Sequence, residues 1–142
     1  MFYNYEQHKQ KLAEANRLNK IAVFGALVDA GITEVTVEFD GYGDSGQIQG
    51  ITANAGKDTV KLPDVVVTVH QPSNCDDNEP LQTVDETLSE AVEALCYDYL
   101  AERHGGWEID DGSFGSFQFD VPACTVELEY TQRSTEFYSE EF

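Results

Sequence analysis

The segment Thr33-Glu34-Val35-Thr36-Val37-Glu38-Phe39 alternates polar and apolar side chains without interruption. Because successive side chains of a β-strand point to opposite faces of the sheet, this alternation predicts a strand with one buried face and one face in solvent. The segment from Cys124 to Thr131 repeats the pattern, with Val126, Leu128 and Tyr130 on one side. The sequence therefore predicts a sheet of which one face is wet.

Further strands are expected on both sides of these segments. The glycine-rich stretch from Asp40 to Gly46 predicts a turn or bulged hairpin, with residues 47–51 as the returning strand. Residues 65–69 predict a third, more buried strand. Residues 107–109 and 114–121 predict two more, the second with a bulge near Gly115.

Two stretches have helical periodicity. Residues 4–30 predict one long helix with an apolar stripe, and its half from Ile21 to Val28 is apolar all round and is expected to be buried on more than one side. The stripe consists of Leu12, Leu18, Ile21, Ala22, Gly25 and Val28. A second helix is expected from Thr83, because Thr83 and Glu86 have the spacing of a capping box. On that helix Glu86, Glu90 and Glu93 would form a row of carboxylates.

This order of helices and strands predicts an α+β fold of the type α-β-β-β-α-β-β-β. The short connections favour a mainly antiparallel sheet of about five to six strands, with the two helices packed on one face. The length of 142 residues favours a single domain over residues 1–142. Its expected parts are an N-terminal helix (1–31), the sheet with the second helix (33–131) and an acidic aromatic tail (132–142).

The net charge limits the classes of partner. Twenty-seven Asp and Glu residues against eight Lys and Arg residues give a formal charge of −19, although residues 1–20 by themselves carry +2. Such a chain repels nucleic acids and anionic membranes, so direct binding to either is not expected. The sequence contains no apolar run of about 20 residues and no signal-peptide pattern, and its three cysteines are irregularly spaced. A cytoplasmic location is therefore expected.

The sequence contains no pattern typical of a catalytic site. The three histidines have no informative spacing, and 27 acids produce close carboxylate pairs by chance, so we expect a non-enzymatic protein without a cofactor. Residues 40–51 do not match the ligand positions of an EF-hand. No metal site is therefore predicted, although Asp40 and Asp44 with Ser45 leave a looser oxygen cage for Ca²⁺ as an alternative.

Three glycine-rich motifs carry a family resemblance. They are DGYGDSGQI at residues 40–48, HGGWE at residues 104–108 and DGSFG at residues 111–115. Together they resemble an uncharacterised family of small proteins from bacteria, phages and other mobile elements, over roughly residues 30–131. The resemblance implies no established activity and no catalytic residue. It implies a mobile-element context, in which an inhibitor of host defence is expected by association.

The acidity leads to the main functional hypothesis, which is binding to the basic surface of a nucleic-acid-binding protein, as a DNA mimic of the anti-restriction or anti-CRISPR type. A DNA duplex carries roughly one charge per 110 Å² of its cylinder. Nineteen charges spread over a surface of about 7,300 Å² reach only about one per 385 Å², so a mimic must gather its carboxylates on one face. The candidate binding residues are Glu34, Glu38, Asp40, Tyr42, Asp44, Glu86, Glu90, Glu93, Trp107, Asp110, Asp111, Glu127 and Glu129.

Two alternatives stay open at this point. The chain is also consistent with a protein–protein interaction module whose acidity serves solubility alone, with Phe137, Tyr138 and Phe142 of the tail as the docking element. The other alternative is a small Ca²⁺-binding domain. The sequence does not define the partner's identity or the oligomeric state.

Overall fold

The computed structural model describes residues 5–42, 45–71, 81–104, 112–132, 139 and 141 of the chain. It contains two helices and seven strands in these residues. In chain order they are α1 (Tyr5–Asp29), β1 (Glu34–Tyr42), β2 (Ser45–Ala55), β3 (Asp58–Val60), β4 (Val66–Gln71), β5 (Gln82–Thr87), α2 (Leu88–Arg103), β6 (Ser113–Asp120) and β7 (Thr125–Gln132). The α+β class is confirmed.

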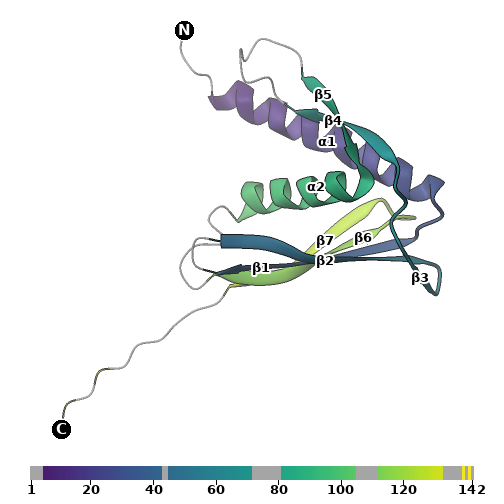
Figure 1. Cartoon of the computed structure of the whole chain (residues 1–142). Coiled ribbons are helices and arrows are strands. Elements are labelled where there is room, and N and C mark those ends of the chain that lie inside the picture. Colours follow the sequence, from purple (N-terminus) through teal and green to yellow (C-terminus); the bar gives the residue numbers. More distant parts are fainter. Residues whose placement is uncertain are drawn as a thin grey trace.

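The strands form two antiparallel sheets. The larger has five strands in the order β3-β2-β1-β6-β7, and the smaller is the hairpin of β4 and β5. Figure 1 shows both helices on the same side of the five-stranded sheet, with α2 lying directly over it and α1 beside the β4–β5 hairpin. The opposite face of that sheet has no described element over it. The predicted mainly antiparallel sheet with two helices on one side is confirmed.

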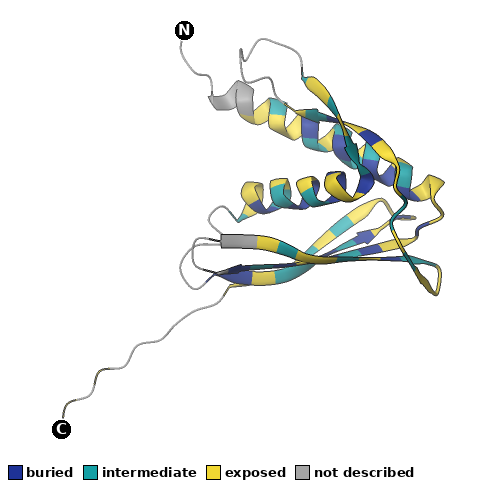
Figure 2. Cartoon of the chain, viewed as in Figure 1, coloured by how far each residue is buried: buried dark blue, intermediate teal, exposed yellow. Residues whose placement is uncertain are grey.

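The core lies between the five-stranded sheet and the two helices and extends to β4. Val35, Val37 and Phe39 of β1 point into it and are at most 2% exposed, as the alternation from Thr33 to Phe39 predicts. Phe117 and Phe119 of β6 lie beside them on the same face. Figure 2 shows this alternation of buried and exposed residues along the strands. Burying one such side chain stabilises the fold by about 1.5–3 kcal/mol.

The buried face of α1 differs from the predicted stripe. Ala15, Asn19, Val23 and Leu27, at intervals of four residues, face the core, whereas Ile21 and Val28 are each 58% exposed. Within the half from Ile21 to Val28, the side chains of Val23, Phe24 and Leu27 are buried. The polar Asn19 belongs to the buried face because its side chain bonds β4: its Nδ2 donates to the carbonyl of His70 (2.9 Å), and the amide of His70 donates to its Oδ1 (2.6 Å).

The start of α2 lies one helical turn later than predicted. The chain contains two consecutive Thr-x-x-Glu motifs, and the structure uses the second: Thr87 is the N-cap, its Oγ1 accepting from the amide of Glu90 (3.2 Å). Thr83 and Glu86 instead belong to β5, where Glu86 lies opposite Val67. Residues 83–87 form a strand because β4 supplies them with a pairing partner. Consequently β4 pairs with β5 and not with the five-stranded sheet.

The predicted bulge near Gly115 is also wrong. β6 keeps an unbroken register with β1 and β7, and the one shift in β1 and β2 lies between Glu38 and Phe39. Gly115 has a different role: a Cβ there would collide with the carbonyl group of Glu129 and would lie 3.1 Å from Cζ of Phe39. Glycine is required at this position because the neighbouring strand and the Phe39 ring occupy the space of a side chain.

Candidate functional site: an acidic sheet face

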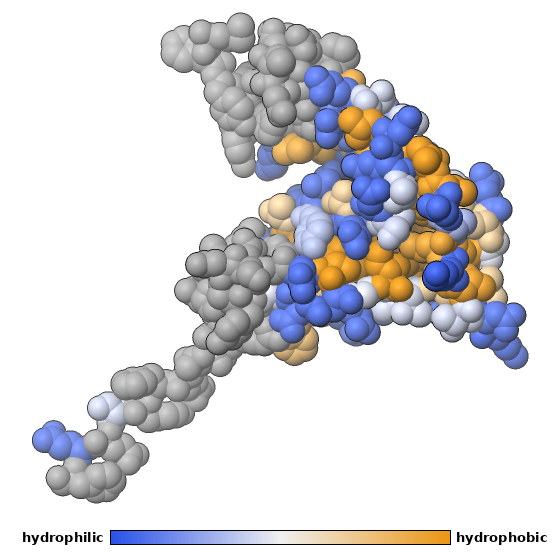
Figure 3. Space-filling view, viewed as in Figure 1, coloured by the Kyte–Doolittle hydropathy of each residue, from blue (hydrophilic) through white to orange (hydrophobic). Residues whose placement is uncertain are grey.

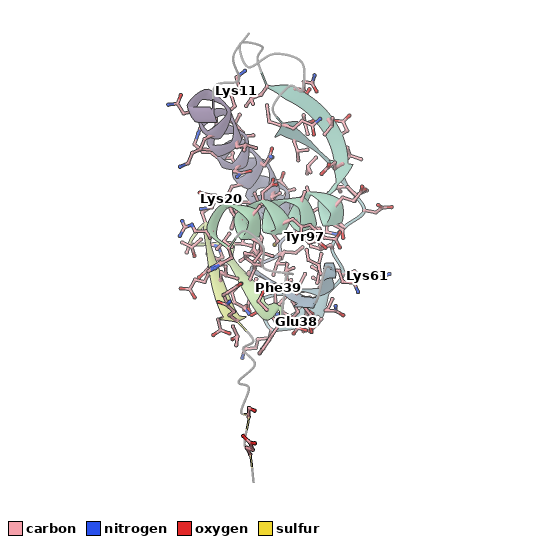
Figure 4. The ribbon with its side chains drawn as sticks, turned by 90° about the vertical axis from the view of Figure 1, so that its left-hand side faces the viewer. Lys11, Lys20, Glu38, Phe39, Lys61 and Tyr97 are labelled. Carbon is pink, nitrogen blue, oxygen red and sulfur yellow. The ribbon has the colours of Figure 1, made fainter. Side chains whose placement is uncertain are left out.

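The face of the five-stranded sheet that points away from the helices is built by the polar half of each alternating strand. In Figure 4 Phe39 lies between the sheet and α2, near Tyr97, while Glu38 next to it in sequence points to the opposite side. The amide of Ile48 donates to Oη of Tyr97 (2.9 Å), which ties β2 to α2 on the covered side. Glu38 and the polar residues next to it lie on the opposite, uncovered side of the sheet.

The register places the side chains of this face in four cross-strand rows over β2, β1, β6 and β7. The rows are Asn54–Glu34–Asp120–Thr125, Thr52–Thr36–Gln118–Glu127, Gly50–Glu38–Ser116–Glu129 and Gln47–Asp40–Phe114–Thr131. We call these sixteen positions the acidic sheet face. Six of them are carboxylates, every row contains at least one, and none is basic.

The absence of basic residues extends beyond this face. In the sequences of β1, β2, β3, β6 and β7 as the structure describes them there is no Lys, Arg or His, so no cation within the sheet neutralises these carboxylates. The uncharged members of the face are mostly Thr, Ser, Asn and Gln. One of their contacts joins two strands: Oγ1 of Thr36 donates to Oε1 of Gln118 (2.9 Å).

The charge density of the face is comparable to that of DNA. Strands lie about 4.8 Å apart and rise about 3.3 Å per residue, so four strands over the seven residues from Glu34 to Asp40 cover about 440 Å². Six carboxylates on that area correspond to about one charge per 75 Å². A duplex carries roughly one per 110 Å² of its cylinder. Six of the chain's acids are therefore gathered on one face of the sheet.

A groove of about 410 Å³ opens at one end of the acidic sheet face. Three carboxylates line it, those of Glu34, Asp120 and Glu127, together with Thr33, Gln118, Phe119, Pro122 and Thr125. The amide of Ala123 donates to Oδ1 of Asp120 (3.3 Å), which holds that carboxylate at the β6–β7 turn. A groove with three anionic groups and no basic lining residue suits an ammonium or guanidinium group from a partner.

One aromatic side chain accompanies the carboxylates. Phe114 of β6 occupies the last row of the face and is 41% exposed, directly opposite Asp40 and Thr131. An exposed aromatic ring at the margin of a charged patch offers packing to the apolar stem or to the guanidinium plane of a basic side chain. Figure 3 shows the hydrophobic surface in a band between the helices and the sheet, with hydrophilic residues along the lower margin of the sheet.

The structure brings some of the predicted binding residues together and separates others. Glu34, Glu38, Asp40, Glu127 and Glu129 all belong to the acidic sheet face. The predicted helical row of Glu86, Glu90 and Glu93 does not exist, because Glu86 is a β5 residue and only the other two lie on α2. These three residues are on the helix side of the sheet. The backbone of Tyr42 ends β1, and Asp44, Trp107, Asp110 and Asp111 lie outside the described residues.

Glu86 has a distinct environment. Its Oε2 is buried without a hydrogen-bond partner, and it lines a cavity of about 220 Å³ with Asn19, His70 and Asp98, among others. Desolvation, and to a smaller extent the charge of Glu86, raises the pKa of Asp98 above its ordinary value. This cavity lies between the two helices and the β4–β5 hairpin, away from the acidic sheet face.

Sequence reasoning named five members of the acidic sheet face and missed the others, among them its sixth carboxylate, Asp120, and its aromatic member, Phe114. The signal was present, because Ser116, Gln118 and Asp120 alternate with the buried Phe117 and Phe119 as the polar residues of β1 alternate with Val35 and Val37. What the sequence does not contain is the pairing of β1 with β6, which joins residues about 80 positions apart.

Three further observations concern the Cys96 thiol, membrane-spanning helices and metal ligands. Burial raises the pKa of the Cys96 thiol, so this cysteine stays protonated at neutral pH and is a poor nucleophile. Neither of the two described helices combines the length and the apolar content that crossing a membrane requires. In the described part of the chain, no group of three or more His, Cys, Asp or Glu side chains could hold a metal ion.

Fold and site together define an α+β protein with a helix-covered core and an open, acidic sheet face. The chain belongs to DUF6878, a family of unknown function, whose match covers residues 15–142. Comparisons with curated proteins and with solved structures give no match. The predicted membership in an uncharacterised family is thereby confirmed.

Proposed function

We propose that the chain is a non-catalytic binding protein whose acidic sheet face contacts a basic surface of a nucleic-acid-binding protein. The observation that carries this proposal is the arrangement of six carboxylates on three adjacent strands, β1, β6 and β7, which, like the neighbouring β2, contain no basic residue. Evenly scattered acids serve solubility equally well. Solubility does not require their concentration on one open face at the charge density of a duplex.

The cost of the arrangement supports a recognition role. Like charges directly opposite each other on neighbouring strands destabilise a sheet, and Glu34 and Asp120 stand in that relation. The chain does contain basic residues, four of them in α1, but none of them is in the strands of this sheet. A surface that accepts repulsion within itself is stabilised when a cationic partner covers it.

The partner class follows from charge density. A basic groove that holds a duplex presents Lys and Arg at the spacing of phosphates, and the acidic sheet face offers carboxylates at a similar density. In this proposal the protein is encoded by a mobile element and occupies such a groove in place of DNA. It thereby inhibits a bacterial defence protein. The family resemblance supports the mobile-element context, and the acidic sheet face supports the mimicry.

A displacement experiment tests the proposal. A purified homeodomain, a small basic DNA-binding domain, is loaded with a fluorescent duplex at 50 mM salt and titrated with the full chain. We expect release of the duplex, with an apparent affinity that falls steeply as salt is raised toward 200 mM, because each replaced charge contact depends on ionic strength. No release at low salt, or release that is indifferent to salt, contradicts the proposal.

A further inference from the structure

The outer edge of β7 is a long, regular strand edge. β7 pairs with β6 at all eight positions from Thr125 to Gln132 without a register shift, and no described strand pairs with its other edge. Proteins protect such edges with short strands, lysines, prolines or bulges. The opposite edge, β3, follows this rule: it is three residues long and lies between Lys57 and Lys61. β7 is eight residues long, contains no Lys or Pro and pairs with β6 without a bulge, and its only charged residues are Glu127 and Glu129.

The charges of β7 determine which strand it can accept. Glu127 and Glu129 are exposed on the acidic sheet face, so a second copy of β7 placed beside the first would bring glutamates close to glutamates. Like charges in cross-strand positions are destabilising. The same two residues favour a strand with Lys or Arg at the positions next to them.

The other face of β7 requires different side chains. Val126 and Leu128 point to the helix side and, with Tyr99 and Phe117, form the apolar part of a groove of about 420 Å³. The rest of its lining is polar and consists of Lys20, Glu102, Arg103 and His104. A strand added to β7 places every second side chain over this groove, because side chains alternate between faces. Apolar, β-branched or aromatic residues fit there.

We propose that β7 accepts an extended segment of the basic partner as an additional strand of the sheet, with Lys or Arg at alternate positions and apolar residues between them. The basic side chains then lie beside Glu127 and Glu129, and the apolar ones lie in the groove with Val126 and Leu128. Main-chain hydrogen bonds to the edge that no described strand occupies supply affinity, and the alternation supplies specificity. This inference rests on the proposed function and specifies how the partner is bound.

Three peptides of equal charge test this mode of binding. They are an alternating hexapeptide Lys-Val-Lys-Val-Lys-Val, a block peptide Lys-Lys-Lys-Val-Val-Val, and the alternating peptide with a fully N-methylated backbone. Each is titrated into the ¹⁵N-labelled full chain while amide shifts and amide exchange are recorded. We expect the alternating peptide to bind at least ten times more tightly than the other two, and to slow amide exchange specifically in residues 125–132.

Chain variants separate this inference from the proposed function. The double variant Glu127→Gln and Glu129→Gln should bind the alternating peptide several-fold more weakly than the parent chain. The matched double variant Asp29→Asn and Asp64→Asn, which changes two exposed acids outside the sheet, should bind it with unchanged affinity. Equal binding of all three peptides with sensitivity to the glutamate variants overturns strand addition and leaves the acidic sheet face as the binding surface. Binding that is indifferent to the glutamate variants contradicts both proposals. Slow exchange along both edges of β7 in the free chain shows that the edge is already paired and overturns the inference.

Discussion

Glu34 of β1 and Asp120 of β6 face each other as direct cross-strand partners on the open side of the sheet, and both are exposed. Their carboxylates also line the same groove. No Lys, Arg or His occurs in the described strands of this sheet to separate the two charges. Because like charges in direct cross-strand positions are destabilising, we expect this pair to lower the stability of the free protein.

Replacing Glu34 by Gln should stabilise the chain. The substitution keeps the shape of the side chain and removes the repulsion from Asp120, which is worth about 0.2–1 kcal/mol for a cross-strand pair. Urea unfolding at low salt measures the gain. It should shrink at high salt, where charges in solvent are screened. A loss of stability at low salt would show that the carboxylate of Glu34 has a favourable partner.

The N-terminus of α2 allows a matched comparison of the two Thr-x-x-Glu motifs. Thr87→Ala removes the oxygen that accepts from the amide of Glu90 and should cost about 0.5–2 kcal/mol in the free energy of unfolding. Thr83→Ala removes an exposed strand residue and should cost less. Chemical denaturation of the two variants measures these losses. A larger loss of stability for Thr83→Ala than for Thr87→Ala would place the start of the helix four residues earlier.

Two glycines should respond in opposite ways to substitution by alanine. Gly115→Ala drives a methyl group into the Glu129 carbonyl and the Phe39 ring and should destabilise the chain by at least about 1–3 kcal/mol. Gly25 lies in α1, and a Cβ added there meets nothing within 4 Å besides its chain neighbours and the nearby helix backbone, so Gly25→Ala should stabilise the chain by up to about 1 kcal/mol. Melting temperatures distinguish the two. A stable Gly115→Ala variant would contradict the close approach of β7 to β6 at this point.

The raised pKa of Asp98 predicts a dependence of stability on pH. A carboxyl group whose pKa is higher in the folded than in the unfolded chain retains its proton preferentially in the folded chain, so its contribution to stability declines as pH rises through the interval above 3.8. Asp98→Asn should therefore be more stable than the parent chain at pH 7, with the difference vanishing at pH 3. Unfolding at both pH values measures this. An advantage that grows toward acid pH would have the wrong sign.

The extent to which sequence predicts this structure depends on whether the determining contacts are local. The faces of β1 and β7 follow directly from alternation, because Val35 and Leu128 have apolar neighbours only at every second position. The start of α2 cannot be derived from the local sequence in this way. Two capping motifs follow each other, and only the pairing of β5 with β4 decides which of them begins the helix. The buried face of α1 was missed because Asn19 lies in it, and its hydrogen bonds to His70 are long-range.

The sequence predicts which side chains of β1 and β7 face solvent. It does not predict that these side chains form one surface. Glu34, Glu38, Glu127 and Glu129 could each be assigned to the wet side of a strand from local sequence. Their gathering depends on β6 pairing with both β1 and β7, which is a tertiary relation. The glutamates of α2 looked equally suitable in the sequence, and the fold places them on the other side of the sheet.

The most direct test of the central claim compares two quadruple variants with equal loss of charge. The face variant is Glu34→Gln, Glu38→Gln, Glu127→Gln and Glu129→Gln, and the control is Asp29→Asn, Asp64→Asn, Glu93→Gln and Glu102→Gln. Affinity for the homeodomain is measured at 50 mM salt by fluorescence anisotropy. We predict a loss of at least tenfold for the face variant and less than threefold for the control. Equal losses in the two variants would show that net charge, and not the acidic sheet face, governs binding.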